Sequence, residues 1–179
     1  MNVAMLTPLF PPDTSDSAAY VKLLAARLDI TPITVIAYGL LPEVVPGVPM
    51  VSIDKSGWKI MTVVRCLYTL QKIKPTTLLV HNGQSTDVPA LLYKMINTRL
   101  QLVYIQSDLA ATTRTNRFWY RWVNQEIKRR AVITITLPAD SDRYLPQEIL
   151  PFATIDNDRT VQQDTWWQSH LTQIKSYVR

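Results

Sequence analysis

At 179 residues and 47% apolar content, the chain is long enough for one domain with a sizeable core, and it carries a net charge of +5. Its four scattered glycines exclude a P-loop and a G-x-G-x-x-G turn, and one cysteine with two distant histidines excludes a disulfide framework or a zinc cluster, so we expect no metal and no bound cofactor. The N-terminus lacks the segments of a signal peptide and no apolar stretch could span a bilayer, so we expect a cytoplasmic protein.

The first unit of the chain is a strand, a long loop and a helix. The strand is predicted over 3–6, three prolines hold the following turn in extended conformations, and the helix begins near Ala18. Asp16 or Ser17 can cap this helix by accepting a backbone N–H bond. In open α/β sheets, ligands bind at loops that follow the carboxyl ends of strands, so this loop is a candidate binding segment. A capped surface loop without a ligand fits the same residues equally well.

The rest of the chain alternates strands with helices. Further strands are predicted over 33–37, 50–53, 77–80, 100–105 and 132–136. Helices are predicted over 58–73, 87–97, 115–130 and 164–179, with either a last short strand or an extended linker over 149–155. This spacing predicts an α/β fold, a doubly wound and mostly parallel Rossmann-like sheet with helices on both faces.

Positive charge is concentrated in the middle of the chain, where residues 59–130 hold 12 Lys and Arg against 3 Asp and Glu. The predicted helix over 115–130 also carries Phe118, Trp119 and Trp122. Basic residues with interfacial aromatics suit an anionic membrane surface, and the candidates for contact with it are Arg117, Arg121, Lys128, Arg129 and Arg130. The alternative is a helix whose aromatics face the sheet while its cations stay in water. Nucleic acid is not expected, because no reader motif accompanies the charge.

Several segments resemble the N-terminal, acceptor-side domain of GT-B glycosyltransferases, in particular the large retaining family four. In the first unit, the residues at the family's places are Thr7, Pro8, Phe10, Pro11, Pro12, Tyr20, Val21, Leu24, Ala25 and Leu28. Further matches are 76–85, 100–109, 129–136 and 149–156. The resemblance implies that residues 1–156 form a single half of a GT-B fold. Ser15 and Asp16 depart from it, because the family has two glycines there that let the backbone approach ligand phosphates.

The donor half of a GT-B enzyme is missing from this pattern. In the family, a second domain binds the nucleotide sugar through two glutamates separated by seven residues. No such pair occurs here, and the chain is too short for a second domain. Residues 157–179 are expected to form a linker and a C-terminal helix that packs back on the domain, with Trp166 and Tyr177 at the places of the family's returning helix. An ordinary amphipathic helix covering one sheet face explains the same residues.

Candidate site residues gather where three predicted strands end. Ser107 and Asp108 stand where the family has a histidine and an aspartate near the acceptor hydroxyl, so the resemblance makes them candidate catalytic residues. Serine cannot act as a general base unaided, and Asp108 could equally cap the next segment. The candidates for binding acceptor or substrate are Ser15, Asp16, His81, Asn82 and Gln106. For His81 the alternative is a structural role as a satisfied polar group.

The resemblance implies sugar transfer from a nucleotide sugar to a carbohydrate or lipid-linked acceptor, with this chain as the acceptor-side domain. The nucleotide sugar is then expected only with a complementing domain, which makes a separate donor-binding subunit an expected partner. The alternative function is a non-catalytic binding or scaffold module derived from a glycosyltransferase. The loss of the glycine pair and of the family's histidine favours that alternative. The basic middle segment adds a peripheral position at the membrane to the expectation.

Overall fold

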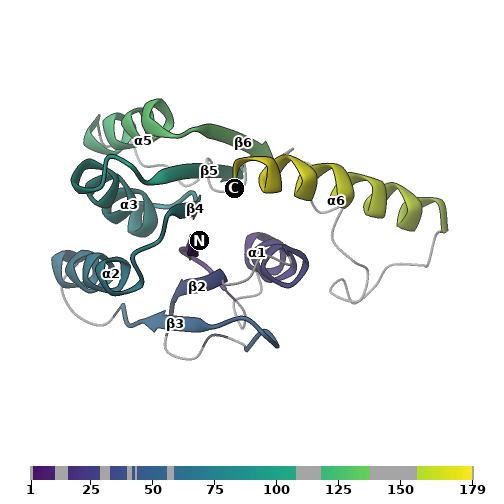
Figure 1. The fold of residues 1–179 in the computed structure, drawn as a ribbon, viewed down its shortest axis with the longest axis horizontal. Helices are drawn as coiled ribbons and strands as arrows, with labels where there is room; N and C mark the ends of the chain where they lie inside the picture. Colours follow the sequence, from purple (N-terminus) through teal and green to yellow (C-terminus); the bar gives the residue numbers. More distant parts are fainter. Residues whose placement is uncertain are drawn as a thin grey trace.

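The structure is a computed structural model that describes residues 2–10, 16–28, 33–39, 42, 44–55, 59–107, 118–137 and 157–178. Within these residues, six strands form one sheet, with the bounds β1 Val3–Thr7, β2 Ile33–Tyr38, β3 Met50–Ile53, β4 Thr77–His81, β5 Gln101–Ser107 and β6 Ile133–Leu137. Every neighbouring pair is parallel, and the order across the sheet is β3-β2-β1-β4-β5-β6 (Figure 1). The predicted α/β, Rossmann-like fold is confirmed.

Helices cover both faces of this sheet, as Figure 1 shows. One face carries α1 (Asp16–Arg27) and α6 (Asn157–Tyr177). The other face carries α2 (Lys59–Ile73), α3 (Gln84–Ile96) and α5 (Phe118–Arg130), with α3 in contact with both of its neighbours. A parallel sheet needs such crossovers, because each helix returns the chain from the end of one strand to the start of the next.

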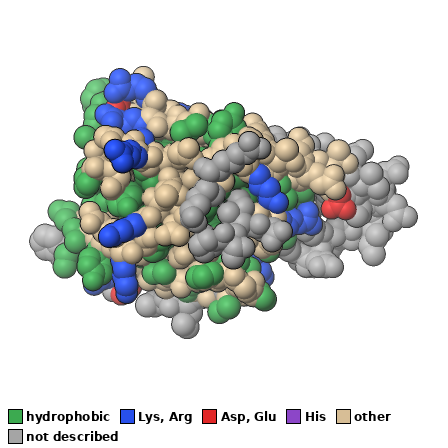
Figure 2. All heavy atoms as spheres, in the orientation of Figure 1, with side chains coloured by type: hydrophobic (Ala, Val, Ile, Leu, Met, Phe, Trp, Pro, Cys, Tyr) green, Lys and Arg blue, Asp and Glu red, His purple; other side chains and the backbone are tan. Residues whose placement is uncertain are grey.

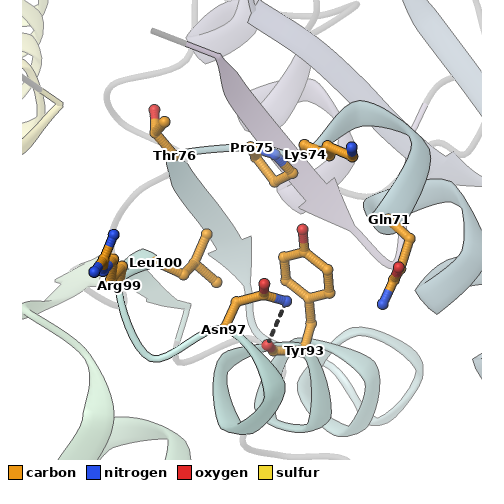
Figure 3. A pocket seen from close by; sticks show the side chains of 8 residues that line it. All are labelled: Gln71, Lys74, Pro75, Thr76, Tyr93, Asn97, Arg99 and Leu100. Atoms are coloured by element: carbon orange, nitrogen blue, oxygen red, sulfur yellow. Dashed lines mark hydrogen bonds between the residues drawn. The ribbon is translucent and has the colours of Figure 1, made fainter.

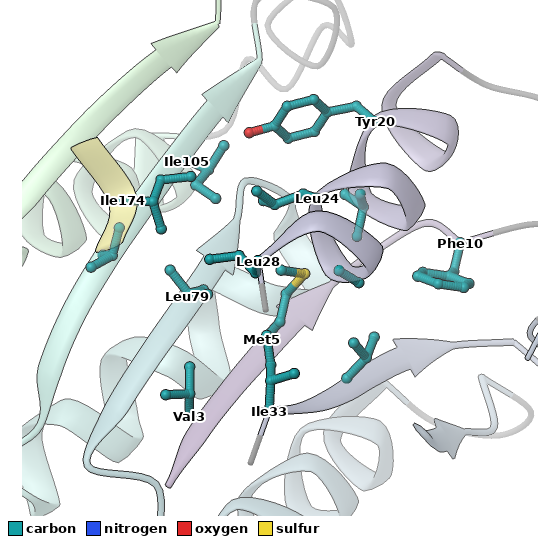
Figure 4. Close-up of a cluster of buried hydrophobic side chains, with 14 of the residues drawn as sticks. Val3, Met5, Phe10, Tyr20, Leu24, Leu28, Ile33, Leu79, Ile105 and Ile174 are labelled. Atoms are coloured by element: carbon teal, nitrogen blue, oxygen red, sulfur yellow. The ribbon is translucent and has the colours of Figure 1, made fainter. Parts of the chain in front are cut away.

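Each face of the sheet has its own hydrophobic core. Val3 and Met5 of β1 point to the α1 and α6 side, where Leu24 and Ile174 pack against them and their neighbours (Figure 4). The alternate residues of the same strand, Ala4 and Leu6, belong to the second core under α2, α3 and α5. Because side chains alternate along a strand, a strand buried on both faces reads as an unbroken apolar sequence, which is what β1 shows.

The order of the strands reverses at β1, which pairs with β2 on one side and β4 on the other. Chain connections leave this point in opposite directions, and in open α/β sheets ligands bind at the carboxyl ends of the strands on either side of such a point. The loops after β1 and β4 touch there. A Cβ at Gly83 would lie 2.8 Å from Cγ of Pro8, a distance that real Cβ atoms do not tolerate. Glycine is therefore required at position 83 by the close approach of two loops.

Helix boundaries differ from the sequence prediction at three places. The first helix begins at Asp16, two residues before the predicted start, and α6 begins at Asn157 instead of Asp164. Helix α3 begins at Gln84 instead of Asp87, so Asp87 lies inside its first turn. The alternative strand or linker over 149–155 lies outside the described residues.

Pro89 lies inside α3, where it cannot donate a hydrogen bond to the carbonyl four residues earlier. That carbonyl belongs to Ser85, and it accepts a 2.6 Å hydrogen bond from the hydroxyl of Tyr38 instead. The end of β2 thereby supplies the donor that the proline lacks, and the helix continues to Ile96. The bond also fixes α3 to the carboxyl edge of the sheet.

Candidate functional site at the carboxyl edge of the sheet

The candidate site lies at the carboxyl edge of β1, β4 and β5, and we call Thr7, His81, Asn82 and Gln106 the rim. His81 pairs with Ile105 across the sheet, and the backbone N–H of Asn82 donates a 2.9 Å bond to the carbonyl of Ile105. The three strand ends therefore lie side by side, as the sequence predicts. The hydroxyl of Thr7 donates to the carbonyl of Leu9 at 2.6 Å, which starts the turn after β1.

His81 is the unusual member of the rim. It is 1% exposed, and among the described residues neither of its ring nitrogens has a hydrogen-bonding partner. It shares a face of β4 with Leu79, on the side of α1, and its ring centroid lies 6.2 Å from that of Tyr20. Burial lowers the pKa of His81 to about 4, so the ring is neutral at pH 7 and presents one donor and one acceptor. Buried polar groups in native proteins normally have partners, so this ring requires an explanation.

The other predicted site residues have different outcomes. Asn82 is buried and Gln106 is half-buried, and both stand beside His81 on the rim. Ser107 is the last residue of β5 and pairs with Leu137. Asp16 is the first residue of α1. Ser15, Asp108 and Arg117 lie outside the described residues. The structure thus brings His81, Asn82 and Gln106 together, and the chemical roles of all these residues stay predictions.

A buried carboxylate next to the rim was not predicted from the sequence. Asp87 is fully buried in the first turn of α3, where its side chain accepts hydrogen bonds from the hydroxyls of Tyr120 at 2.8 Å and Tyr104 at 3.1 Å and from the N–H of Gly83 at 3.2 Å. The amide of Asn124 donates to the Tyr104 hydroxyl at 2.7 Å. Burial raises the pKa of Asp87 to about 6, although these hydrogen bonds oppose the rise.

This network joins α3, β5 and α5 through one carboxylate, so it fixes where α5 begins relative to the rim. The signal in the sequence was an aspartate on the apolar side of a helix, four residues after a glycine. Sequence patterns alone do not reveal its partners, because Tyr104, Tyr120 and Asn124 come from two later elements.

Around His170, an aromatic cluster attaches α6 to α1. Tyr20 and His170 share a 2.6 Å hydrogen bond between Oη and Nε2, and the rings of Trp166 and His170 stack at 4.6 Å. Trp167 is 1% exposed and stacks on Tyr20 at 5.6 Å. The guanidinium of Arg27 lies 5.2 Å from the Trp167 ring and forms an ion pair with Asp164 at 3.7 Å. Burial lowers the pKa of His170 to about 4.

The described cavity lies at the opposite edge of the sheet. It has a volume of about 310 Å³ and is formed where α2 and α3 end and β4 and β5 begin (Figure 3). Its lining consists of Gln71, Lys74, Pro75, Thr76, Tyr93, Asn97, Arg99 and Leu100. None of the rim residues lines it, so it is separate from the candidate site.

The described residues contain no group of three or more His, Cys, Asp or Glu side chains that could hold a metal ion. None of their helices combines the length and apolar character needed to cross a membrane. Cys66 is a buried free thiol, and burial raises its pKa to about 12.

No protein-family model and no curated protein matches this chain. Among solved structures, the chain is similar to the UDP-GlcNAc 2-epimerase of Neisseria meningitidis bound to UDP-GlcNAc, with 16% identity and a TM-score of 0.50 over 84% of this chain and 44% of that one. The UDP-GlcNAc 2-epimerase of Methanocaldococcus jannaschii gives 13% identity and a TM-score of 0.47 over 91% and 48%. This chain spans less than half of the length of each of these two epimerases.

At such identities the likeness concerns the fold alone. UDP-GlcNAc 2-epimerases share the GT-B fold with glycosyltransferases, so the expected GT-B-like architecture is supported at that level. The finer resemblance to family-four glycosyltransferases stays a prediction.

Proposed function

We propose that this chain is the acceptor-side domain of a GT-B enzyme that transfers a sugar from a nucleotide sugar to a carbohydrate or lipid-linked acceptor. The nucleotide sugar would be held by a complementing donor domain, on a separate subunit or elsewhere in the same protein. The observation that carries the proposal is His81, which is neutral and has no hydrogen-bond partner among the described residues, at the switch point of the sheet. Open α/β sheets bind their ligands at this point.

A sugar hydroxyl fits the chemistry of the rim. A neutral imidazole offers one donor and one acceptor on opposite sides of the ring, and neighbouring hydroxyls of a sugar can accept from one nitrogen and donate to the other. Asn82 follows His81 along the chain and Gln106 follows Ile105, the partner of His81 on β5, and their carboxamides can likewise donate and accept. Phosphates are less suited, because the four rim residues include no Lys or Arg and no glycine-rich turn of free N–H groups, and Lys55, which lies near this edge, donates its Nζ to the carbonyl of Pro8 at 3.1 Å. The proposal therefore assigns this edge to the acceptor.

The test is a search for saccharide binding by saturation-transfer NMR with a panel of mono- and oligosaccharides. We expect at least one saccharide to bind, and Gln106→Ala to weaken that binding. Arg99→Ala, which changes a lining residue of the cavity at the opposite edge, is the matched control and leaves binding intact.

Two outcomes would contradict the proposal. One is that no saccharide in the panel binds, which favours a non-catalytic scaffold module. The other is that Arg99→Ala abolishes binding while Gln106→Ala has no effect, which would move the site to the cavity at the opposite edge of the sheet.

A further inference from the structure

Helices α2 and α5 expose large apolar side chains on the surface that faces away from the sheet. Phe118 is 86% exposed and Trp122 is 54% exposed. We call the full set the docking face, and it consists of Ile60, Met61, Val64 and Tyr68 on α2 with Phe118, Trp119 and Trp122 on α5. Phe118, Trp119 and Trp122 therefore do not face the sheet, which contradicts the alternative that these aromatics of the helix turn inward.

Most of the docking face lies on the same side as the rim. Helix α2 follows β3 along the chain and α5 follows β5, so both helices begin at the carboxyl edge of the parallel sheet. Ile60, Met61 and Val64 lie in the first turns of α2, and Phe118 and Trp122 lie in the first turns of α5. The Asp87 network holds the start of α5 in this place through Tyr120.

The helices of the docking face carry Lys59, Arg65 and Arg121 in their first two turns, whereas Lys74 and Arg99 line the cavity at the opposite edge of the sheet. The described part of 59–130 as a whole contains ten basic residues, which are Lys59, Arg65, Lys72, Lys74, Lys94, Arg99, Arg121, Lys128, Arg129 and Arg130. Its acidic residues are Asp87, which is buried, and Glu126, which binds Arg129 and Arg130 at 2.7 Å each. Figure 2 shows Lys and Arg side chains beside hydrophobic ones on the side where Figure 1 places these helices.

We propose that the docking face binds the surface of an anionic lipid bilayer. Phe and Trp side chains enter the boundary between headgroups and acyl chains, and Lys and Arg bind the anionic headgroups. A second copy of the chain fits poorly, because pairing the same faces would bring like charges together. A nucleic acid would be attracted by the charge but would leave Ile60 and Met61 exposed to water.

Docking of this kind sets the orientation of the domain. With the first turns of α2 and α5 at the bilayer, the carboxyl edge of the sheet lies near the membrane surface. An acceptor attached to a lipid would then reach the rim without leaving the bilayer, and this consequence alone rests on the proposed function.

The experiment measures co-sedimentation of the protein with vesicles of phosphatidylcholine alone and of phosphatidylcholine mixed with phosphatidylglycerol. We expect binding only to the mixed vesicles, with an affinity that falls as salt is added. Phe118→Glu and Trp122→Glu should each weaken binding about tenfold or more, because each removes an inserted aromatic and adds a negative charge. Val44→Glu is the matched control, since Val44 is 77% exposed in the connection between β2 and β3.

The inference fails if the unmodified protein ignores mixed vesicles at low salt, or if all three variants bind equally well. It also fails if the protein forms dimers in solution that Phe118→Glu dissociates, because the face would then be an interface between copies. Unchanged unfolding temperatures show that the variants are folded. Saccharide binding in the absence of lipid is measured separately, so failure of docking and failure of the proposed function are distinguishable.

Discussion

Replacing His81 distinguishes a structural role of its ring from a role in binding. A buried polar group without a partner costs about 1–3 kcal/mol, and replacing it by an apolar side chain of similar size can stabilise a protein. We therefore expect His81→Leu to raise the free energy of unfolding by about 1 kcal/mol and to abolish saccharide binding. Urea unfolding and NMR binding measure the two effects. A large loss of stability with binding retained would show that the ring is a structural group.

The buried histidines also predict how stability depends on pH. The pKa values of His81 and His170 are about 4 in the folded protein, below the usual 6.5, so between these values the unfolded chain binds more protons. Stability should fall as the pH drops from 6.5 towards 4, by up to about 3 kcal/mol for each histidine. Urea unfolding at a series of pH values measures this, and a flat profile would contradict it.

Asp87 acts in the opposite direction, because its pKa of about 6 lies above its ordinary value of 3.8. The folded protein binds the extra proton between these values, so this group adds stability on the acid side that is lost as the pH rises through 6. Asp87→Asn removes the opposing effect. The acid loss of stability should therefore become steeper in this variant than in the unmodified protein, and a shallower profile would show that the carboxylate is not protonated in this range.

Gly83 tests the close contact between the loops that follow β1 and β4. A methyl group there would overlap the ring of Pro8, so Gly83→Ala should lower the free energy of unfolding by about 1–3 kcal/mol. Removing the ring by Pro8→Gly in the same chain should make the double variant more stable than the sum of the two single changes predicts. Additive effects in thermal unfolding would mean that the two residues do not touch.

For individual residues, the sequence predicts the position in the fold better than it predicts the partners of the side chain. His81, Asn82 and Gln106 could be assigned to one edge because the carboxyl ends of parallel strands meet there. The sequence could not predict that His81 has no hydrogen-bond partner within the described part of the chain, nor which residues bond Asp87. Both depend on side chains of distant elements that only folding brings near.

At the scale of elements, α6 is attached to the domain by its tryptophans. Trp166 packs against the first core from a half-buried position, whereas Trp167 is fully buried and contacts Tyr20 and Arg27. Trp167→Ala should therefore lower the free energy of unfolding by about 3–5 kcal/mol, clearly more than Trp166→Ala does. The sequence indicated the helix but placed the emphasis on Trp166, because adjacent tryptophans cannot be ranked without the direction of the helix.

Proteolysis provides the second measurement on α6. If Trp167 holds the helix, residues after Asn157 resist cleavage in the unmodified protein and are removed rapidly in Trp167→Ala. Cleavage at the same rate in both proteins would show that the aromatic cluster does not hold this helix.

Element types and their order were predictable throughout the described chain, because β-branched runs and helical periodicity differ clearly. The boundaries were less predictable. The early start of α3 depends on Gly83, and its passage through Pro89 depends on a hydroxyl from β2. The sequence could likewise not predict that Phe118 and Trp122 are exposed, since a helix with aromatics at this spacing can turn them inward or outward.

For the whole molecule, the proposed function means that the two substrates of a sugar transfer bind to two different domains. This chain should then bind nucleotide sugars no more tightly than roughly millimolar, which corresponds to about 4 kcal/mol. Calorimetry with UDP- and GDP-sugars measures this. A micromolar dissociation constant would place the donor on this chain and contradict the division.

The most direct test of the central claim is to locate the bound saccharide by NMR. We expect that the best-binding saccharide of the panel shifts the ring resonances of His81 and the backbone resonances of Asn82 and Gln106, while those of Tyr93 and Arg99 at the opposite edge stay unchanged. Shifts confined to Tyr93 and Arg99, with His81 unaffected at saturating saccharide, would contradict an acceptor site at the carboxyl edge of the sheet.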